Sequence, residues 1–187
     1  MVGDGRLARM VRPFQQGLSA HDYPNDSFDD FLTEIAALYG GMFTDLQRDF
    51  PQMCVLCHGY DWVVPQRGRW LGAPLASRDI SDPTLQADIV RVLIDRFNAV
   101  LIDLADQFPN VRHIDCRSAC AHWHDELHPN SEGFKSVAAR FATAIRQART
   151  EFIDANPAAH CPGPTAFRSA ARDLTDGDFR LSSNECG

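Results

Sequence analysis

The chain has 187 residues, of which 44% are hydrophobic and 23% charged, a balance typical of one globular domain with its own core. Acidic residues outnumber basic ones by 25 to 18, which gives a net charge of −7 and argues against a general nucleic-acid-binding protein. No apolar run approaches the roughly 20 residues of a membrane span, and residues 1–5 are charged and rich in glycine, unlike a signal peptide. We therefore expect a cytoplasmic protein without a membrane span.

Hydrophobic periodicity predicts three long helices and two strands. Residues 1–26 are an irregular entry segment with a short helix near residues 6–11. Apolar residues spaced three and four apart predict the long helices, at about residues 27–50, 83–108 and 131–152. Short continuous apolar runs predict buried strands at residues 53–57 and 111–116. Residues 62–81 are predicted to be a long loop and residues 156–187 a disordered tail, so the domain spans residues 1–155.

This alternation of helices and strands is typical of an α/β fold with a parallel sheet. Two strands are too few to cover three long amphipathic helices, so we expect further N-terminal strands, supplied by sequence before residue 1. Without them the sheet would expose one edge, and the chain would tend to associate or aggregate through that edge.

The stretch from Trp123 to Phe134 has the most chemical content. Asp125 and His128 are three residues apart, and a single helix-like turn would place them on one face. A carboxylate beside an imidazole can hold one ring N–H, fix the tautomer and leave the other nitrogen free to accept a proton. The alternative is structural, with Asp125 and Ser131 as helix caps and His128 as an ordinary polar residue.

A second polar cluster, His58-Gly59-Tyr60-Asp61, follows the first predicted strand. Ligand sites in open α/β sheets gather at the carboxyl ends of strands, so these four residues are candidate substrate-binding residues. The alternative is a glycine turn in which Tyr60 packs over the edge of the sheet.

The run Asp125-x-x-His128-Pro129-x-x-x-Gly133 resembles the last conserved block of the SGNH (GDSL-type) ester hydrolases. In that family the histidine is the general base and the aspartate orients it. The resemblance extends from about residue 28 to residue 145, and residues 58–61 are similar to the strand-end turn of one bacterial branch. It implies a three-layer α/β/α sandwich with a five-stranded, flavodoxin-like parallel sheet, of which this chain would be the C-terminal half. It also implies hydrolysis of a small-molecule ester by a Ser-His-Asp site, with no cofactor and no metal.

Two of the family's elements are missing from the sequence. No Gly-Asp-Ser supplies a nucleophile, and no Gly-x-Asn-Asp supplies the oxyanion asparagine. Ser118 and Ser131 are near His128 in the sequence, but neither is in a nucleophile elbow, so we expect neither to replace the serine. We expect the serine to come from upstream sequence, because losing it alone typically costs about 10⁶ in rate.

Other functions stay open at this point. The chain could be an inactive remnant of such a domain or a partner-dependent binding module. Three histidines and a carboxylate within seven residues could instead bind Zn²⁺, although their spacing matches no common metal motif: His122, His124, Asp125 and His128. The paired cysteines, Cys54/Cys57 and Cys116/Cys120, could also form a zinc site, but their apolar surroundings favour buried free thiols and a reducing compartment.

Overall fold

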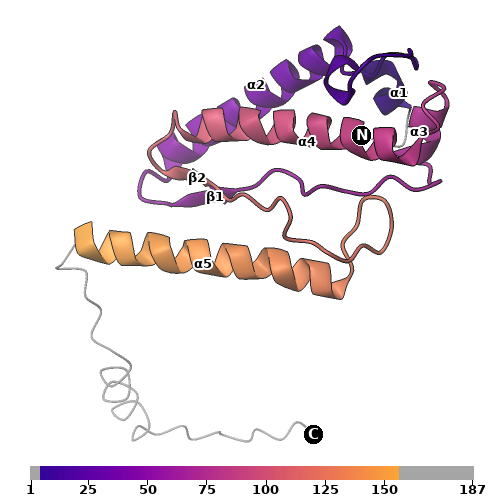
Figure 1. The fold of residues 1–187 in the computed structure, drawn as a ribbon. Coiled ribbons are helices and arrows are strands. Elements are labelled where there is room, and N and C mark those ends of the chain that lie inside the picture. Colours follow the sequence, from indigo (N-terminus) through magenta and orange to yellow (C-terminus); the bar gives the residue numbers. More distant parts are fainter. Residues whose placement is uncertain (1–4, 156–187) are drawn as a thin grey trace, which may run out of the picture. The chain divides into compact units, whose positions relative to one another are not determined.

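The computed structural model of the chain describes residues 5–155, so the predicted tail at residues 156–187 lies outside the described residues. The described part has a mixed α/β architecture (Figure 1). Its elements, in chain order, are α1 (Arg6–Met10), the 3₁₀ turn η2 (Ala20–Asp22), α2 (Asp26–Asp49), β1 (Val55–Cys57), α3 (Gly72–Ala76), α4 (Pro83–Ala105), β2 (Val111–His113) and α5 (Ser131–Ala155). Among the described helices, none is long and apolar enough to cross a membrane.

Capping side chains set the starts of α2 and α4. The Asn25 side chain accepts a hydrogen bond from the backbone N–H of Ser27 (3.0 Å), which satisfies one of the free donors of the first turn of α2. Asp82 accepts bonds from two N–H groups in the first turn of α4, and Pro83 follows it as the first helical residue. These starts agree with the sequence prediction.

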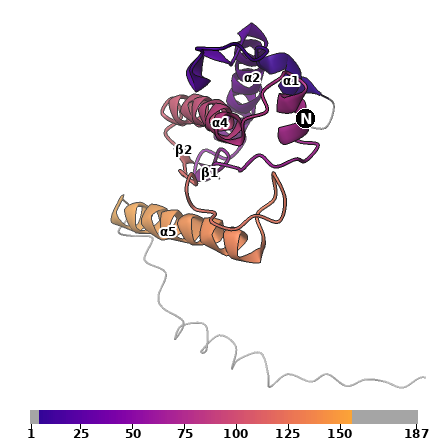
Figure 2. The ribbon, with the colours of Figure 1, turned by 45° about the vertical axis from the view of Figure 1, so that its right-hand side comes forward.

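The largest core lies between α2 and α4. Apolar side chains of α1, of α2 and of α4 pack together with residues of the segment that follows β1; the fully buried members include Tyr23, Leu75, Ile80 and Ile89. A smaller cluster joins the last turns of α2, through Phe43, to Cys57 of β1 and Val111 of β2. Both views show why two clusters form: α2 crosses α4 obliquely and reaches the strands with its C-terminal end (Figure 1, Figure 2).

The two strands pair in parallel, as predicted, with Val55 opposite Val111 and Cys57 opposite His113. The Val55 N–H donates to the carbonyl of Asn110 (2.7 Å), and the Cys57 carbonyl accepts from the N–H of Ile114 (2.8 Å). Successive residues of a strand direct their backbone groups to opposite edges, so the N–H and C=O of Leu56 point away from β2. No other described strand pairs with that edge.

Three predictions about local structure are wrong in detail. Both strands are shorter than the apolar runs that predicted them, and Cys54, predicted to be buried, precedes β1 and is exposed. The segment from 62 to 81 is not a continuous loop but contains the short helix α3. Leu75 of this helix is fully buried in the core, and the backbone ahead of it forms hydrogen bonds with the stretch that carries Asp125 and His128.

Candidate functional site

The structure brings Asp125 and His128 into direct contact. The two carboxylate oxygens of Asp125 lie 2.9 and 2.8 Å from Nδ1 of His128. Oδ1 of Asp125 also accepts the backbone N–H groups of Leu127 and His128, both at 2.8 Å, which closes the turn between them. The side chain of His128 is 59% exposed, and no described residue forms a hydrogen bond with its Nε2. The pair therefore has the geometry of an oriented general base with one nitrogen turned to solvent.

The same contacts explain the electrostatics of the pair. The N–H groups of Leu127 and His128, together with the His128 ring, favour the ionised carboxylate and lower the pKa of Asp125 from 3.8 to about 2. Asp125 therefore stays negative across the physiological range. A fixed negative charge at Nδ1 holds the proton there and stabilises the imidazolium that forms when Nε2 accepts a second proton.

The polypeptide on both sides of this turn is held by short backbone contacts. The N–H of His124 donates to the carbonyl of His128 (2.7 Å), and an isolated antiparallel bridge links Trp123 to Pro129. Asn130 then caps α5 by accepting two N–H bonds at 3.0 Å. Gly133 allows the first turn of α5 to approach closely, because a Cβ there would lie 2.8 Å from the carbonyl oxygen of His122. The position of His128 thus depends on the start of α5.

Glu126, between Asp125 and His128, is a functional candidate that the sequence analysis missed. Its side chain is 2% exposed, and its carboxylate accepts five backbone N–H groups from residues 66–72. Oε1 accepts from Gln66 (2.8 Å), Gly68 (3.2 Å) and Gly72 (2.8 Å), and Oε2 from Trp70 (2.9 Å) and Leu71 (3.1 Å). Successive N–H groups in a curved backbone form a site for an anion, and here the anion is a side chain of the same chain.

Burial disfavours the charged form of Glu126, but the five N–H donors outweigh it, and the pKa of Glu126 falls below its usual 4.5. The glycines make this arrangement possible, since a Cβ on Gly72 would overlap the carbonyl of Gln66. Glu126 therefore holds residues 66–72 against the Asp125–His128 turn. Sequence alone gave no signal for this role, because Gly68 and Gly72 are 58 and 54 residues from Glu126 and nothing local marks backbone N–H groups as the partners of a carboxylate.

The cluster His58-Gly59-Tyr60-Asp61 divides into separate roles. His58 is exposed and its ring packs edge-on against Phe141 of α5, with ring centroids 5.2 Å apart. The Gly59 N–H donates to Nε2 of His113 (3.3 Å). The hydroxyl of Tyr60 donates to the carbonyl of Leu127, next to His128, so Tyr60 is the member of the cluster that adjoins the Asp125–His128 turn.

Asp61 is 6% exposed and forms hydrogen bonds with the loop after β2. Its carboxylate accepts the backbone N–H groups of Trp62 (2.6 Å), Ser118 (2.5 Å) and Cys120 (2.6 Å). Ser118 has a φ of 60°, a left-handed conformation that costs energy in a residue with a Cβ and that these bonds hold in place. Asp61 thus holds the backbone of the loop that leads to the Asp125–His128 turn.

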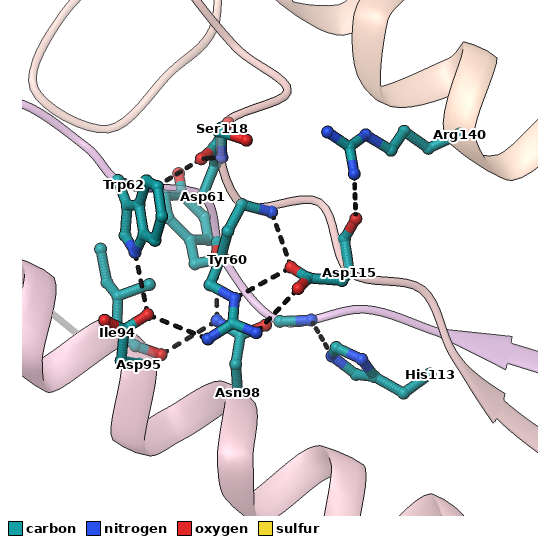
Figure 3. Close-up of polar contacts among 12 residues, drawn as sticks. Tyr60, Asp61, Trp62, Ile94, Asp95, Asn98, His113, Asp115, Ser118 and Arg140 are labelled. Atoms are coloured by element: carbon teal, nitrogen blue, oxygen red, sulfur yellow. Dashed lines mark hydrogen bonds and ion pairs between the residues drawn. The ribbon is translucent and has the colours of Figure 1, made fainter.

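A polar network joins α4 to the ends of both strands (Figure 3). Oδ1 of Asp95 accepts from the indole N–H of Trp62 (2.9 Å) and from Nη1 of Arg117 (3.0 Å). Arg117 also binds both oxygens of Asp115, which lowers the pKa of Asp115 from 3.8 to about 2. Nη1 of Arg140 in α5 donates to the backbone carbonyl of Asp115 (3.0 Å). These ion pairs and hydrogen bonds fix the loop geometry and contain no group placed for proton transfer with His128.

The alternative chemistries gain no support within residues 5–155. No three His, Cys, Asp or Glu side chains there come together as a metal site, so His122 and His124 do not join the Asp125–His128 pair as further ligands. Burial raises the pKa of the thiols of Cys57, Cys116 and Cys120, which disfavours thiolate nucleophiles. Within the described residues, no hydrogen bond joins Ser118 or Ser131 to His128.

Comparison of the chain with protein-family models, with curated proteins and with solved structures finds no match.

Proposed function

We propose that this chain contributes the aspartate and the general base of a serine ester hydrolase of the SGNH type, with a three-layer α/β/α fold when the sheet is complete. The observation that carries the proposal is the contact of both carboxylate oxygens of Asp125 with Nδ1 of His128, at 2.8 and 2.9 Å, in a histidine whose side chain is 59% exposed. The Asp-x-x-His-Pro spacing and the parallel strands support it.

In this mechanism Nε2 of His128 accepts the proton of a serine hydroxyl as the oxygen bonds to the ester carbonyl carbon. The carbonyl oxygen becomes an oxyanion, and its collapse breaks the bond to the alcohol, which takes the proton from Nε2–H. Water then repeats the sequence on the acyl-enzyme and releases the acid. Asp125 holds Nδ1–H throughout and stabilises the imidazolium; its pKa of about 2 keeps it ionised.

The serine and the oxyanion donors would come from a segment other than residues 1–187, on the same polypeptide or on a partner. Gly-Asp-Ser and Gly-x-Asn-Asp are both missing from the sequence. Because members of a triad act as a unit, residues 1–187 alone should hydrolyse esters hardly faster than water does.

The test is to treat the protein from its native source with a fluorophosphonate, which reacts with activated serines, and to map the labelled peptide. We expect a labelled serine outside residues 1–187, and His128→Ala should reduce both labelling and hydrolysis of p-nitrophenyl acetate by about 10⁵–10⁶. His124→Ala is the matched control, because His124 lies in the same turn but contributes its backbone N–H. Label that persists in His128→Ala, or a protein that no fluorophosphonate labels, would leave a non-catalytic binding module as the better explanation.

A further inference from the structure

A pocket of about 400 Å³ adjoins the Asp125–His128 turn. Its walls come from α1, α2, α4, the segment after β1 and the Asp125–His128 turn. The lining residues include Phe28, Ile35, Leu93, Phe97, Val63 and Leu127. Apart from Arg6 and the thioether of Met10, every lining side chain is aliphatic or aromatic. The proposed mechanism uses none of this space.

The size of the pocket matches a small ligand. Binding sites for small molecules commonly measure about 300–1,000 Å³. At roughly 30 Å³ per heavy atom, the share of one water molecule in the liquid, the 400 Å³ pocket holds about a dozen heavy atoms. That is the number in a fatty acid of ten carbons.

The chemistry of the walls favours an alkyl chain over water or peptide. Water in this pocket would find few hydrogen-bonding partners, and apolar walls exposed to it are unfavourable. A peptide segment would bring N–H and C=O groups into walls that cannot satisfy them, at a cost for each buried group. An alkyl chain has no such groups and gains free energy with each methylene it buries.

The pocket lies next to the Asp125–His128 turn. Leu127 lines the pocket and directly precedes His128. Tyr60 lines it as well, is 37% exposed, and donates its hydroxyl hydrogen bond to the carbonyl of Leu127. A chain that fills the pocket would therefore reach Tyr60 and Leu127, the residue that precedes His128.

We infer that this pocket binds the acyl chain of the substrate, so that the enzyme acts on esters of medium-chain fatty acids of about ten carbons. The inference rests on the proposed function, which makes the bound alkyl chain part of a substrate. The binding of an alkyl chain is a property of the pocket alone. It can therefore be measured without catalysis.

The experiment is calorimetric titration of the 187-residue chain with butyrate, octanoate and decanoate below their micellar concentrations. Affinity should rise about fourfold for each added methylene, the ratio that corresponds to about 0.8 kcal/mol per buried CH₂. Ile35→Trp, which fills the pocket from α2, should weaken decanoate binding about tenfold or more, because the indole takes the space of at least two methylenes. Leu38→Trp is the matched control, since Leu38 is on the same helix but 62% exposed, and its affinity should match that of the unmodified chain.

Val63→Phe provides a second pocket variant for the case in which Ile35→Trp does not fold. Saturable binding that fails to strengthen with chain length, or equal affinities of Ile35→Trp and Leu38→Trp, would overturn the inference. So would binding by the isolated chain but not by the protein from its native source, because another segment would then fill the pocket. A failure of fluorophosphonate labelling with intact decanoate binding would remove the hydrolase and leave the fatty-acid site.

Discussion

Glu126→Gln should destabilise the protein through the backbone of residues 66–72. The substitution keeps the size of the side chain and replaces one carboxylate oxygen with an NH₂ group. With the amide oxygen at the position of Oε1, three of the five N–H bonds survive. The NH₂ group then faces the N–H groups of Trp70 and Leu71, which lose their acceptor.

The magnitude follows from those two bonds. A hydrogen bond to a charged group contributes about 1.5–3 kcal/mol, and a buried donor left without an acceptor costs a similar amount. Removing the buried charge of Glu126 relieves part of its desolvation, so we expect a net loss of about 2–4 kcal/mol. With a urea m-value of about 1–3 kcal/mol/M, the midpoint of unfolding should fall by roughly 1–2 M.

Urea unfolding followed by circular dichroism measures this loss. Glu132→Gln is the control, because Glu132 is 64% exposed and pairs with Lys135 at the surface, where such pairs contribute about 0–1 kcal/mol. Trypsin adds a local measurement, since Arg67 and Arg69 are exposed within the held segment and should be cleaved faster in Glu126→Gln. Equal urea midpoints for Glu126→Gln and Glu132→Gln would refute the role assigned to Glu126.

Three further predictions concern the same turn. Gly133→Ala should lower stability by about 1–3 kcal/mol in thermal unfolding, because the new Cβ lies 2.8 Å from a backbone carbonyl oxygen, whereas Gly41→Ala, with no atom within 4 Å, should not destabilise. In ¹⁵N NMR at neutral pH, uncharged His128 should have its proton on Nδ1, and Asp125→Ala should move it to Nε2; a proton already on Nε2 in the unmodified chain would contradict the orienting role. The folded-state pKa values of Asp125 and Glu126 are lowered, so their contribution is fully present above about pH 4.5 and is lost as pH falls toward 2; urea midpoints should drop across that window, and less so in Glu126→Gln.

Features with local causes could be predicted from the sequence. The starts of α2 and α4 follow from Asn25 and Asp82, whose side chains cap the first turns. The contact of Asp125 with His128 is also local, because a turn of three residues is enough to form it. The parallel pairing of the strands followed from two apolar runs separated by a helix. The three-layer sandwich and the ester hydrolase activity stay predictions.

Features that depend on partners distant in the sequence could not be predicted. The five donors of Glu126 lie 54 to 60 residues away and are backbone groups that any sequence possesses. The helix α3 escaped prediction because it has only five residues, and two of them, Gly72 and Pro74, are poor helix formers. The burial of Leu75 and the acceptor supplied by Glu126 stabilise it from outside.

Each of the four consecutive residues in the Asp125–His128 turn has a different neighbour. Asp125 binds the His128 ring, and Glu126 turns inward to residues 66–72. Leu127 lines the apolar pocket, and His128 faces solvent. Leu71 links the inward contacts, since its N–H binds Glu126 while its side chain lines the same pocket as Leu127. Any shift of Glu126 would therefore move the pocket wall and the base together, which explains why a buried carboxylate stands between the two residues that would carry the proton chemistry.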